Sequence, residues 1–264
     1  MWKTVILPAA LLLGGLPYHY DTTVYTIASD KIHKPMRLCV LADVHCRPFG
    51  KHHSRLMRII SRMRPDAVLI PGDLFDLGRD YEISYDLIGQ LRDMPVFFTP
   101  GNHDNYLDEL PQLCARLEAM GVHVLDQSAY VLQEGENTLE IAGLHDLGRR
   151  ARVPVSEADR LFHTDAFRIL LSHRPCHVQF YGQCSCDLIV CGHAHGGQWR
   201  IPFTKQGIFV KEEGLFPRYT DGMHDLNGHK VVISRGLASG HPRVPRLYNP
   251  PEVVFIDLLP QKNI

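Results

Sequence analysis

The stretch RLCVLADVH, residues 37–45, defines the first element of the fold and ends in polar side chains. Its apolar run has the length of a β-strand and stops abruptly at Asp43-Val44-His45. Two residues spaced i and i+2 at a strand end point to the same side, so both can reach one bound ion. The stretch therefore predicts a buried strand with two candidate metal ligands at its carboxyl end.

The same pattern recurs at four further places. Apolar runs at 67–71, 96–100, 167–171 and 188–191 end in Gly-Asp, Gly-Asn-His-Asp, Ser-His and Gly-His-Ala-His. Amphipathic segments that predict helices follow the first three of the five runs, at 54–64, 82–94 and 108–120. Alternation of strand and helix predicts parallel pairing in an α/β domain, with the functional site beyond the carboxyl ends of the strands.

The remaining segments predict short strands. They lie at 122–125, 130–133, 139–142, 231–234 and 252–259, and Asn227-Gly228 supplies a two-residue hairpin turn before the fourth. We expect these strands to form a second sheet packed on the first, with helices outside. A domain over 36–264 would then follow a linker, 19–35, whose residues 22–27 alternate like an edge strand.

Composition restricts the class of protein. The 264 residues carry a formal net charge of -1, with 45% hydrophobic and 22% charged residues, which is typical of a packed globular chain. The absence of a basic surplus argues against a nucleic-acid partner. Seven cysteines, an odd number, do not predict a disulfide scaffold. Sixteen histidines are the compositional outlier, and histidine is the commonest metal ligand.

The first 18 residues predict a signal segment or membrane anchor. Residues 5–16 are almost wholly apolar after Lys3, and no small-x-small cleavage site follows them. We therefore expect an uncleaved anchor and an extracytoplasmic, membrane-associated protein. A buried N-terminal strand or helix and a cytoplasmic location are the alternatives.

The polar clusters together match the needs of two divalent metal ions. Two ions about 3.5–4 Å apart require one carboxylate that bridges them, further imidazole or oxygen ligands, and open positions for water and substrate. Each motif alone occurs often by chance, and a lone buried histidine is usually a core residue. Five clusters at the ends of five predicted strands favour a shared site.

The order Asp-x-His, Gly-Asp, Gly-Asn-His-Asp, His, Gly-His-x-His resembles the calcineurin-like metallophosphoesterase superfamily over about residues 36–259. The resemblance implies a four-layer α-β-β-α sandwich of two mixed sheets. It implies one metal held by Asp43, His45, Asp73 and His195, and a second held by Asp73, Asn102, His173 and His193, with Asp73 bridging. It also implies that His103 assists the leaving group and that Asp76 orients His103; the plainer interpretation of Asp76 is a loop cap.

Local details narrow the resemblance. Leu77-Gly78 stands where the Ser/Thr protein phosphatases have Arg-Gly, which argues against protein phosphatase activity. The extended motif from Gly192 to Gln198 is similar to a small bacterial branch that often carries an N-terminal anchor. The mixed nitrogen and oxygen ligands suit Mn, Fe or Zn.

The expected reaction is hydrolysis of a phosphoester or pyrophosphate by a metal-bridging hydroxide, on a lipid-linked or nucleotide-sugar substrate. A nuclease-type phosphodiesterase and a non-catalytic metal-binding scaffold are the alternatives, and no oligomeric state is predicted. Further substrate-site candidates are His52, His53 and His145. The apolar residues after the last motif could line a lipid tail, but core packing is favoured for Phe203, Phe209, Leu215, Phe216 and Tyr219.

Overall fold

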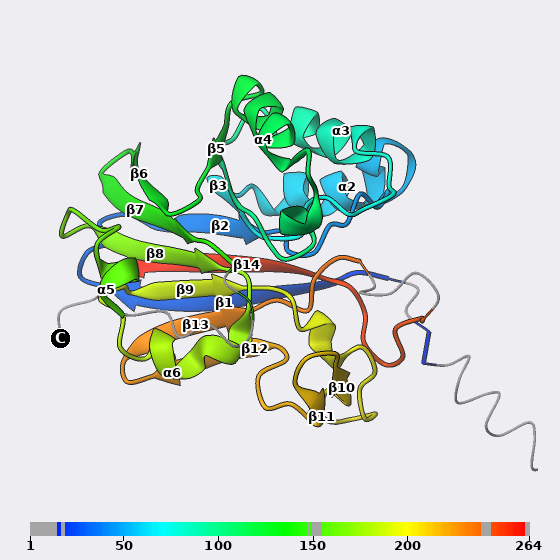
Figure 1. Ribbon diagram of the computed structural model, residues 1–264. Helices are drawn as coiled ribbons and strands as arrows, with labels where there is room; N and C mark the ends of the chain where they lie inside the picture. Colours follow the sequence, from blue (N-terminus) through cyan, green and yellow to red (C-terminus); the bar gives the residue numbers. More distant parts are fainter. Residues whose placement is uncertain (1–14, 17–18, 147, 149–154, 239–243, 262–264) are drawn as a thin grey trace, which may run out of the picture.

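Two six-stranded mixed sheets pack face to face, with helices on both outer faces (Figure 1). The computed structural model describes residues 15–16, 19–146, 148, 155–238 and 244–261. The predicted α-β-β-α sandwich of two mixed sheets is confirmed.

The first sheet has the strand order β1-β14-β2-β3-β4-β5. Strands β2 to β5 run parallel to one another, while β14 is antiparallel to β2 and parallel to β1. The strands are β1 (Asp21–Ser29), β2 (Met36–Val40), β3 (Ala67–Pro71), β4 (Val96–Thr99), β5 (Val122–Val124) and β14 (Glu252–Pro260).

The second sheet has the order β12-β13-β9-β8-β7-β6, with a parallel centre and an antiparallel strand at each edge. The predicted hairpin is present, because Leu226 pairs with His229 across Asn227-Gly228, and both turn residues have positive φ. The strands are β6 (Ser128–Glu134), β7 (Asn137–Leu144), β8 (Phe167–Ser172), β9 (Leu188–Cys191), β12 (Gly222–Leu226) and β13 (His229–Ile233).

Helices cover the outer faces. On the first sheet lie α2 (Ser54–Met63), α3 (Glu82–Gln90) and α4 (Leu110–Ala119); on the second lie α5 (Val155–Asp159) and α6 (Val178–Tyr181). Helix α2 buries Leu56 and Ile60, which share one face because they are four residues apart. Short 3-10 turns occur at Lys51–His53, Asp104–Tyr106, Pro175–His177 and His195–Gly197, and a small hairpin joins β10 (Phe209–Val210) to β11 (Gly214–Leu215).

The core divides along the strand alternation. In β2, Leu38 and Val40 point between the sheets, whereas Cys39 points to the helices of the first outer layer. Opposite them, Ile169 and Leu171 of β8 fill the same inter-sheet layer. Alternating side chains thus bury both faces of each central strand and fix its register.

The distribution of strands between the sheets differs from the prediction. We expected residues 122–125 and 252–259 in the second sheet, but β5 and β14 belong to the first. Strand β14 is buried along its first five residues, so it occupies a central place between β1 and β2. Conversely, β8 and β9 belong to the second sheet, so the five polar clusters are shared between both sheets.

The N-terminal anchor predicted for residues 1–18 lies outside the described residues, apart from Gly15 and Leu16. Within the described part of the chain, no helix is both long enough and apolar enough to cross a bilayer. Strand β1, in the predicted linker, forms one edge of the first sheet.

Candidate metal centre

The loops that follow β2, β3 and β4 of the first sheet meet those that follow β8 and β9 of the second. This convergence brings together all seven side chains expected to bind metal, because the five strands end on the same side of the sandwich. Six are buried, and His193 is 12% exposed at its side chain. The contacts among them define two clusters, one around His195 and one around His173.

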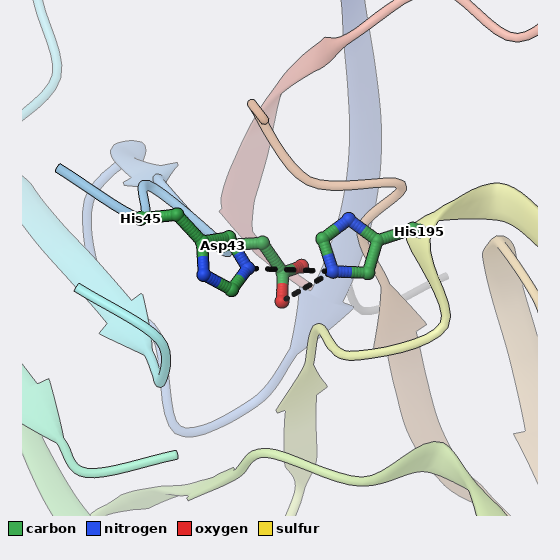
Figure 2. Close-up of side chains that lie close together, drawn as sticks. All are labelled: Asp43, His45 and His195. Carbon is green, nitrogen blue, oxygen red and sulfur yellow. Dashed lines mark hydrogen bonds and ion pairs between the residues drawn. The ribbon is translucent and has the colours of Figure 1, made fainter. Parts of the chain in front are cut away.

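The first cluster consists of Asp43, His45 and His195 (Figure 2). Nε2 of His195 lies 3.4 Å from Nε2 of His45 and 3.7 Å from Oδ1 of Asp43. Nδ1 of His195 donates to the carbonyl of Ala238 at 3.0 Å, which leaves Nε2 with its lone pair toward the cluster. Converging lone pairs of this kind fit a cation.

The second cluster contains Asp73, Asn102, His173 and His193. Nε2 of His173 lies 3.2 Å from Oδ2 of Asp73, 3.1 Å from Oδ1 of Asn102 and 3.2 Å from Nδ1 of His193. Nδ1 of His173 faces the carbonyl of Pro71 at 2.9 Å.

Asp73 belongs to the second cluster and also lies close to the first. Its Oδ2 lies 3.2 Å from Nε2 of His173 and 3.6 Å from Nε2 of His45. A single carboxylate between two groups of imidazoles is the arrangement that a bridging ligand requires.

The electrostatics of the clusters also fit positive ions. Burial opposes ionisation of Asp73, but His173 and His45 hold the pKa of its carboxyl well below the usual range. Burial opposes protonation of His173, yet Asp73 raises the pKa of this imidazole to about 10. Burial lowers the pKa of His45 to about 4. The carboxylates therefore favour a positive charge beside them, while His45 remains neutral at pH 7, as a metal ligand must be.

Glycines permit close approach of the backbone at this centre. A Cβ atom on Gly101 would lie 2.3 Å from Oδ1 of Asp73, and one on Gly192 would lie 2.8 Å from Oδ2 of Asp43. A side chain at either position would therefore displace a candidate ligand, and glycine avoids that clash.

His103 and Asp76 lie beside the first cluster. Nδ1 of His103 is 2.9 Å from Oδ1 of Asp76, and the backbone N–H of His103 donates to Oδ1 of Asp73 at 2.8 Å. Burial lowers the pKa of the His103 ring, but the bond to Asp76 and the charge of Asp73 outweigh it and raise the pKa overall. The Asp76 contact uses Nδ1 and leaves Nε2 as the second nitrogen of a ring that is one-third exposed.

Sequence reasoning missed Asp104. This buried carboxylate accepts the backbone N–H groups of Asp73 at 2.7 Å, Phe75 at 2.7 Å and Gly101 at 2.8 Å. It thus ties together the two loops that carry Asp73 and Asn102. The fourth residue of Gly-Asn-His-Asp was a signal in the sequence, but its role depends on a loop that precedes it by about thirty residues.

Two buried arginines were also missed. Arg174 donates to Oδ1 of Asp146 at 2.6 Å, bonds Glu212, and lies 3.2 Å from Nε2 of His193. Arg246 donates to the carbonyl of Arg235 at 2.6 Å and to that of Ala238, the acceptor for His195. The first follows a predicted ligand directly, whereas no sequence pattern distinguishes the second.

Other candidates from the sequence have partners elsewhere. His52 contacts Asp86 at 3.2 Å, His53 contacts the carbonyl of Ile83 at 2.9 Å, and His145 contacts Asp126 at 2.9 Å. The expected core packing after the last motif is wrong for four side chains, whose exposed fractions are 107% for Phe203, 41% for Phe209, 68% for Leu215 and 58% for Phe216. Tyr219 is half-buried and packs against the outer core.

Comparisons with known proteins point in one direction. The sequence model described as calcineurin-like phosphoesterase matches residues 36–197. Phosphodiesterase YaeI of Escherichia coli is 28% identical over 234 residues, which cover 85% of this chain and 83% of that protein. Metallophosphoesterase Cj0846 of Campylobacter jejuni is 29% identical over 245 residues, covering 87% of this chain but 60% of that protein.

A third relative carries a membrane description. The transmembrane protein with metallophosphoesterase domain of Danio rerio is 33% identical over 181 residues, covering 62% of this chain and 41% of that protein. Among solved structures, NAD nucleotidase of Haemophilus influenzae superposes with a TM-score of 0.50 at 16% identity, over 82% of this chain and 46% of that one. This last likeness concerns the fold alone.

Proposed function

Because this chain belongs to the calcineurin-like phosphoesterase family and is a metal-dependent phosphohydrolase, we propose that it hydrolyses a phosphodiester or pyrophosphate bond in a lipid-linked or nucleotide-sugar substrate. The observation that carries the proposal is the position of Asp73 between two clusters of imidazoles. The relative from Escherichia coli is named a phosphodiesterase, which supports a diester.

In this proposal the chain holds two divalent ions. Asp43, His45 and His195 would hold one, and Asn102, His173 and His193 would hold the other. Asp73 would contribute to both. Mn, Fe and Zn suit these nitrogen and oxygen donors. When bound, such ions lower the pKa of a coordinated water toward 7 and polarise the phosphoryl oxygens.

The remaining chemistry belongs to His103. Its raised pKa favours the protonated ring, and Nε2, the nitrogen that does not face Asp76, can pass a proton to the departing oxygen. Asp76 fixes the ring through Nδ1, so the proton to be transferred resides on Nε2. The backbone N–H of His103 also donates to Oδ1 of Asp73, so the residue is held at two points, its backbone by Asp73 and its ring by Asp76.

We also place the protein at the extracytoplasmic face of a membrane. Two features support this location: the apolar stretch at residues 5–16 and the name of the relative from Danio rerio.

Metal analysis combined with an ester assay tests the proposed function. The purified full chain, supplied with Mn²⁺ or Zn²⁺, should hold about two ions and cleave bis-nitrophenyl phosphate. His193→Ala should reduce the content to about one ion and abolish most turnover, whereas His145→Asn, outside the clusters, should change neither. One ion or none after supplementation, together with no cleavage of monoester or diester, would refute the proposal.

A further inference from the structure

A concentration of exposed apolar side chains follows the last ligand motif. We call residues 198–218 the apolar loop. Among the described residues, half of the large apolar side chains that are exposed belong to it. They are Trp199, Ile201, Phe203, Phe209, Leu215 and Phe216, and the side chain of Phe203 is fully exposed at 107%. Scattered exposed residues are ordinary, but a gathered group of this size marks an interaction surface.

Backbone bonds hold the parts of this loop side by side. The N–H of Ile208 donates to the carbonyl of Trp199 at 2.7 Å, and the N–H of Phe216 donates to the carbonyl of Ile208 at 2.8 Å. In the hairpin, Phe209 and Leu215 are cross-strand partners. The backbone that carries the exposed side chains is therefore one connected, hydrogen-bonded support, on which Phe209 and Leu215 lie opposite each other.

Charge on the loop favours an anionic partner. The exposed charged side chains of residues 198–218 are Lys205, Lys211 and Arg218. Two of the carboxylates nearby pair with buried arginines, because Glu212 bonds Arg174 and Asp221 bonds Arg200 at 3.0 Å. Aromatic side chains with basic neighbours are typical of protein surfaces that rest on anionic lipid headgroups.

The start of the described chain adjoins the same loop. The carbonyl of Gly15 accepts the N–H of Tyr248 at 2.6 Å, and the adjacent Leu247 pairs with Trp199 in a β-bridge. Residues 5–13, which precede Gly15, read VILPAALLL. Gly15, which follows this apolar stretch in the sequence, thus lies beside a neighbour of the apolar loop.

The loop also borders the metal centre. Oε2 of Glu212, between the two hairpin strands, lies 3.6 Å from Nε2 of His193. We propose that the apolar loop is a docking face for a bilayer with anionic headgroups, and that it places the metal centre at the membrane surface. This inference deepens the membrane location given under the proposed function and rests on it.

The two tryptophans of the chain offer a direct test. Trp2→Phe leaves Trp199 as the single tryptophan of the full chain. Reconstituted into vesicles of phosphatidylglycerol and phosphatidylcholine, this variant should show a blue-shifted emission that brominated lipid quenches. The shift should be smaller in pure phosphatidylcholine and at high salt, because the basic side chains contribute.

Variants in the same background separate the parts of the surface. Phe203→Ser with Phe216→Ser should abolish most of the quenching. Lys205→Glu with Lys211→Glu should reduce the apparent affinity for the anionic surface, on the order of fivefold for each positive charge that is lost. The matched control is Val131→Ser. Val131 is an exposed apolar residue outside the apolar loop, on β6, the edge strand of the second sheet at the far end from β12.

Three outcomes would overturn the docking face. If the protein co-sediments with the vesicles but lipid neither shifts nor quenches the emission of Trp199, residues 1–18 bind the membrane without the apolar loop. Quenching that survives the double serine variant would exclude the aromatic side chains. A blue shift that depends on protein concentration rather than lipid would indicate contact between copies. Turnover of soluble bis-nitrophenyl phosphate and metal content, measured on the same samples, report separately on the proposed function.

Discussion

Substitution of His103 can distinguish a metal ligand from a proton donor, because loss of a ligand lowers metal content whereas loss of a proton donor lowers turnover alone. Nδ1 of His103 contacts Asp76, and its backbone N–H donates to Asp73. The ring belongs to neither of the two clusters; it forms a separate group with His45 and Asp76. The ring lies edge-on to His45, with centroids 4.7 Å apart. These contacts favour a proton donor that stands beside the metals.

We therefore expect His103→Asn to retain about two ions and to lose about 10²- to 10⁴-fold in kcat, the usual contribution of a general acid. Asp76→Asn should lose less, because Nε2 remains while its orientation weakens. Metal content and steady-state kinetics on one preparation make the comparison. If metal and turnover fall together in His103→Asn, the ring is a ligand. With a substrate whose leaving group has a low pKa and needs no proton, the loss of kcat in His103→Asn should be smaller.

At this scale the sequence identified side chains that lie directly after apolar runs, such as Asp43 and His173. Strand length and polarity are local properties, and a strand end fixes where the next residue points. Asp104 could not be assigned in that way, since Asp73 and Phe75, which donate to it, lie about thirty residues earlier in the chain. Arg246 could not be assigned either, since it bonds backbone carbonyls, which carry no side-chain signal in the sequence. Their roles follow from loop packing, which no single stretch encodes.

Between elements, Glu140 of β7 links a strand of the second sheet to the turn before β8. Its side chain is buried and accepts the backbone N–H groups of His163 at 2.7 Å and Thr164 at 3.0 Å, and the hydroxyl of Thr164 at 2.8 Å. Burial opposes ionisation, but these donors outweigh it and lower the pKa of the carboxyl.

Glu140→Gln should destabilise the fold at pH 7 by about 1.5–3 kcal/mol, because an amide cannot accept from all three donors. A depressed pKa stabilises the folded state above the unfolded value, about 4.3, and this stabilisation is lost as pH falls through the folded pKa. Urea unfolding at pH 7 and below pH 4 should therefore show a gap that narrows in acid. Glu134→Gln, exposed on β6, should change stability by less than about 0.5 kcal/mol. A gap of equal size at both pH values would contradict the charged role of Glu140.

Strands and helices were predictable where one local signal dominated. The limits of β3 and β9 match the sequence prediction residue for residue, because both are short runs of wholly buried residues. Helix α3 is shorter than expected: it ends at Gln90 rather than Met94, because Leu91 leaves the helical conformation, with φ −95° and ψ 2°. The sheet to which β14 belongs was missed because pairing with β1 and β2 joins the two ends of the domain. The exposure of Phe203 was missed because hydrophobicity alone predicts burial.

Across the whole molecule, the candidate ligands divide between the two sheets. Loops after β2, β3 and β4 supply Asp43, His45, Asp73 and Asn102, and loops after β8 and β9 supply His173, His193 and His195. Each cluster therefore draws on both sheets. An ion bound to either cluster would join the two layers, and unfolding would have to release it.

Removal of metal should accordingly lower the thermal midpoint of unfolding. A ligand at 100 times its Kd stabilises by about 2.7 kcal/mol per site, and 1 kcal/mol shifts Tm by about 2–4 °C in a chain of this size, so a loss of roughly 5–10 °C per site is expected after chelation. Calorimetry before and after chelation measures it. His193→Ala should show a smaller metal-dependent shift, and His145→Asn the full shift.

The metal-dependent shift should also grow with pH, for a reason that follows from the two buried carboxylates. Without metal, burial raises the pKa of Asp43 to about 6, and Asp73, against the effect of burial, raises that of His173 to about 10. At these two groups the folded metal-free chain binds more protons than the unfolded chain, Asp43 between about pH 4 and 6 and His173 between about pH 6.5 and 10, so their contribution to stability falls as pH rises through those ranges. Bound ions replace those protons, and the loaded chain is spared the loss. The Tm difference between loaded and chelated protein should thus be larger at pH 8 than at pH 5, and a difference that shrinks toward pH 8 would show that the clusters do not hold metal.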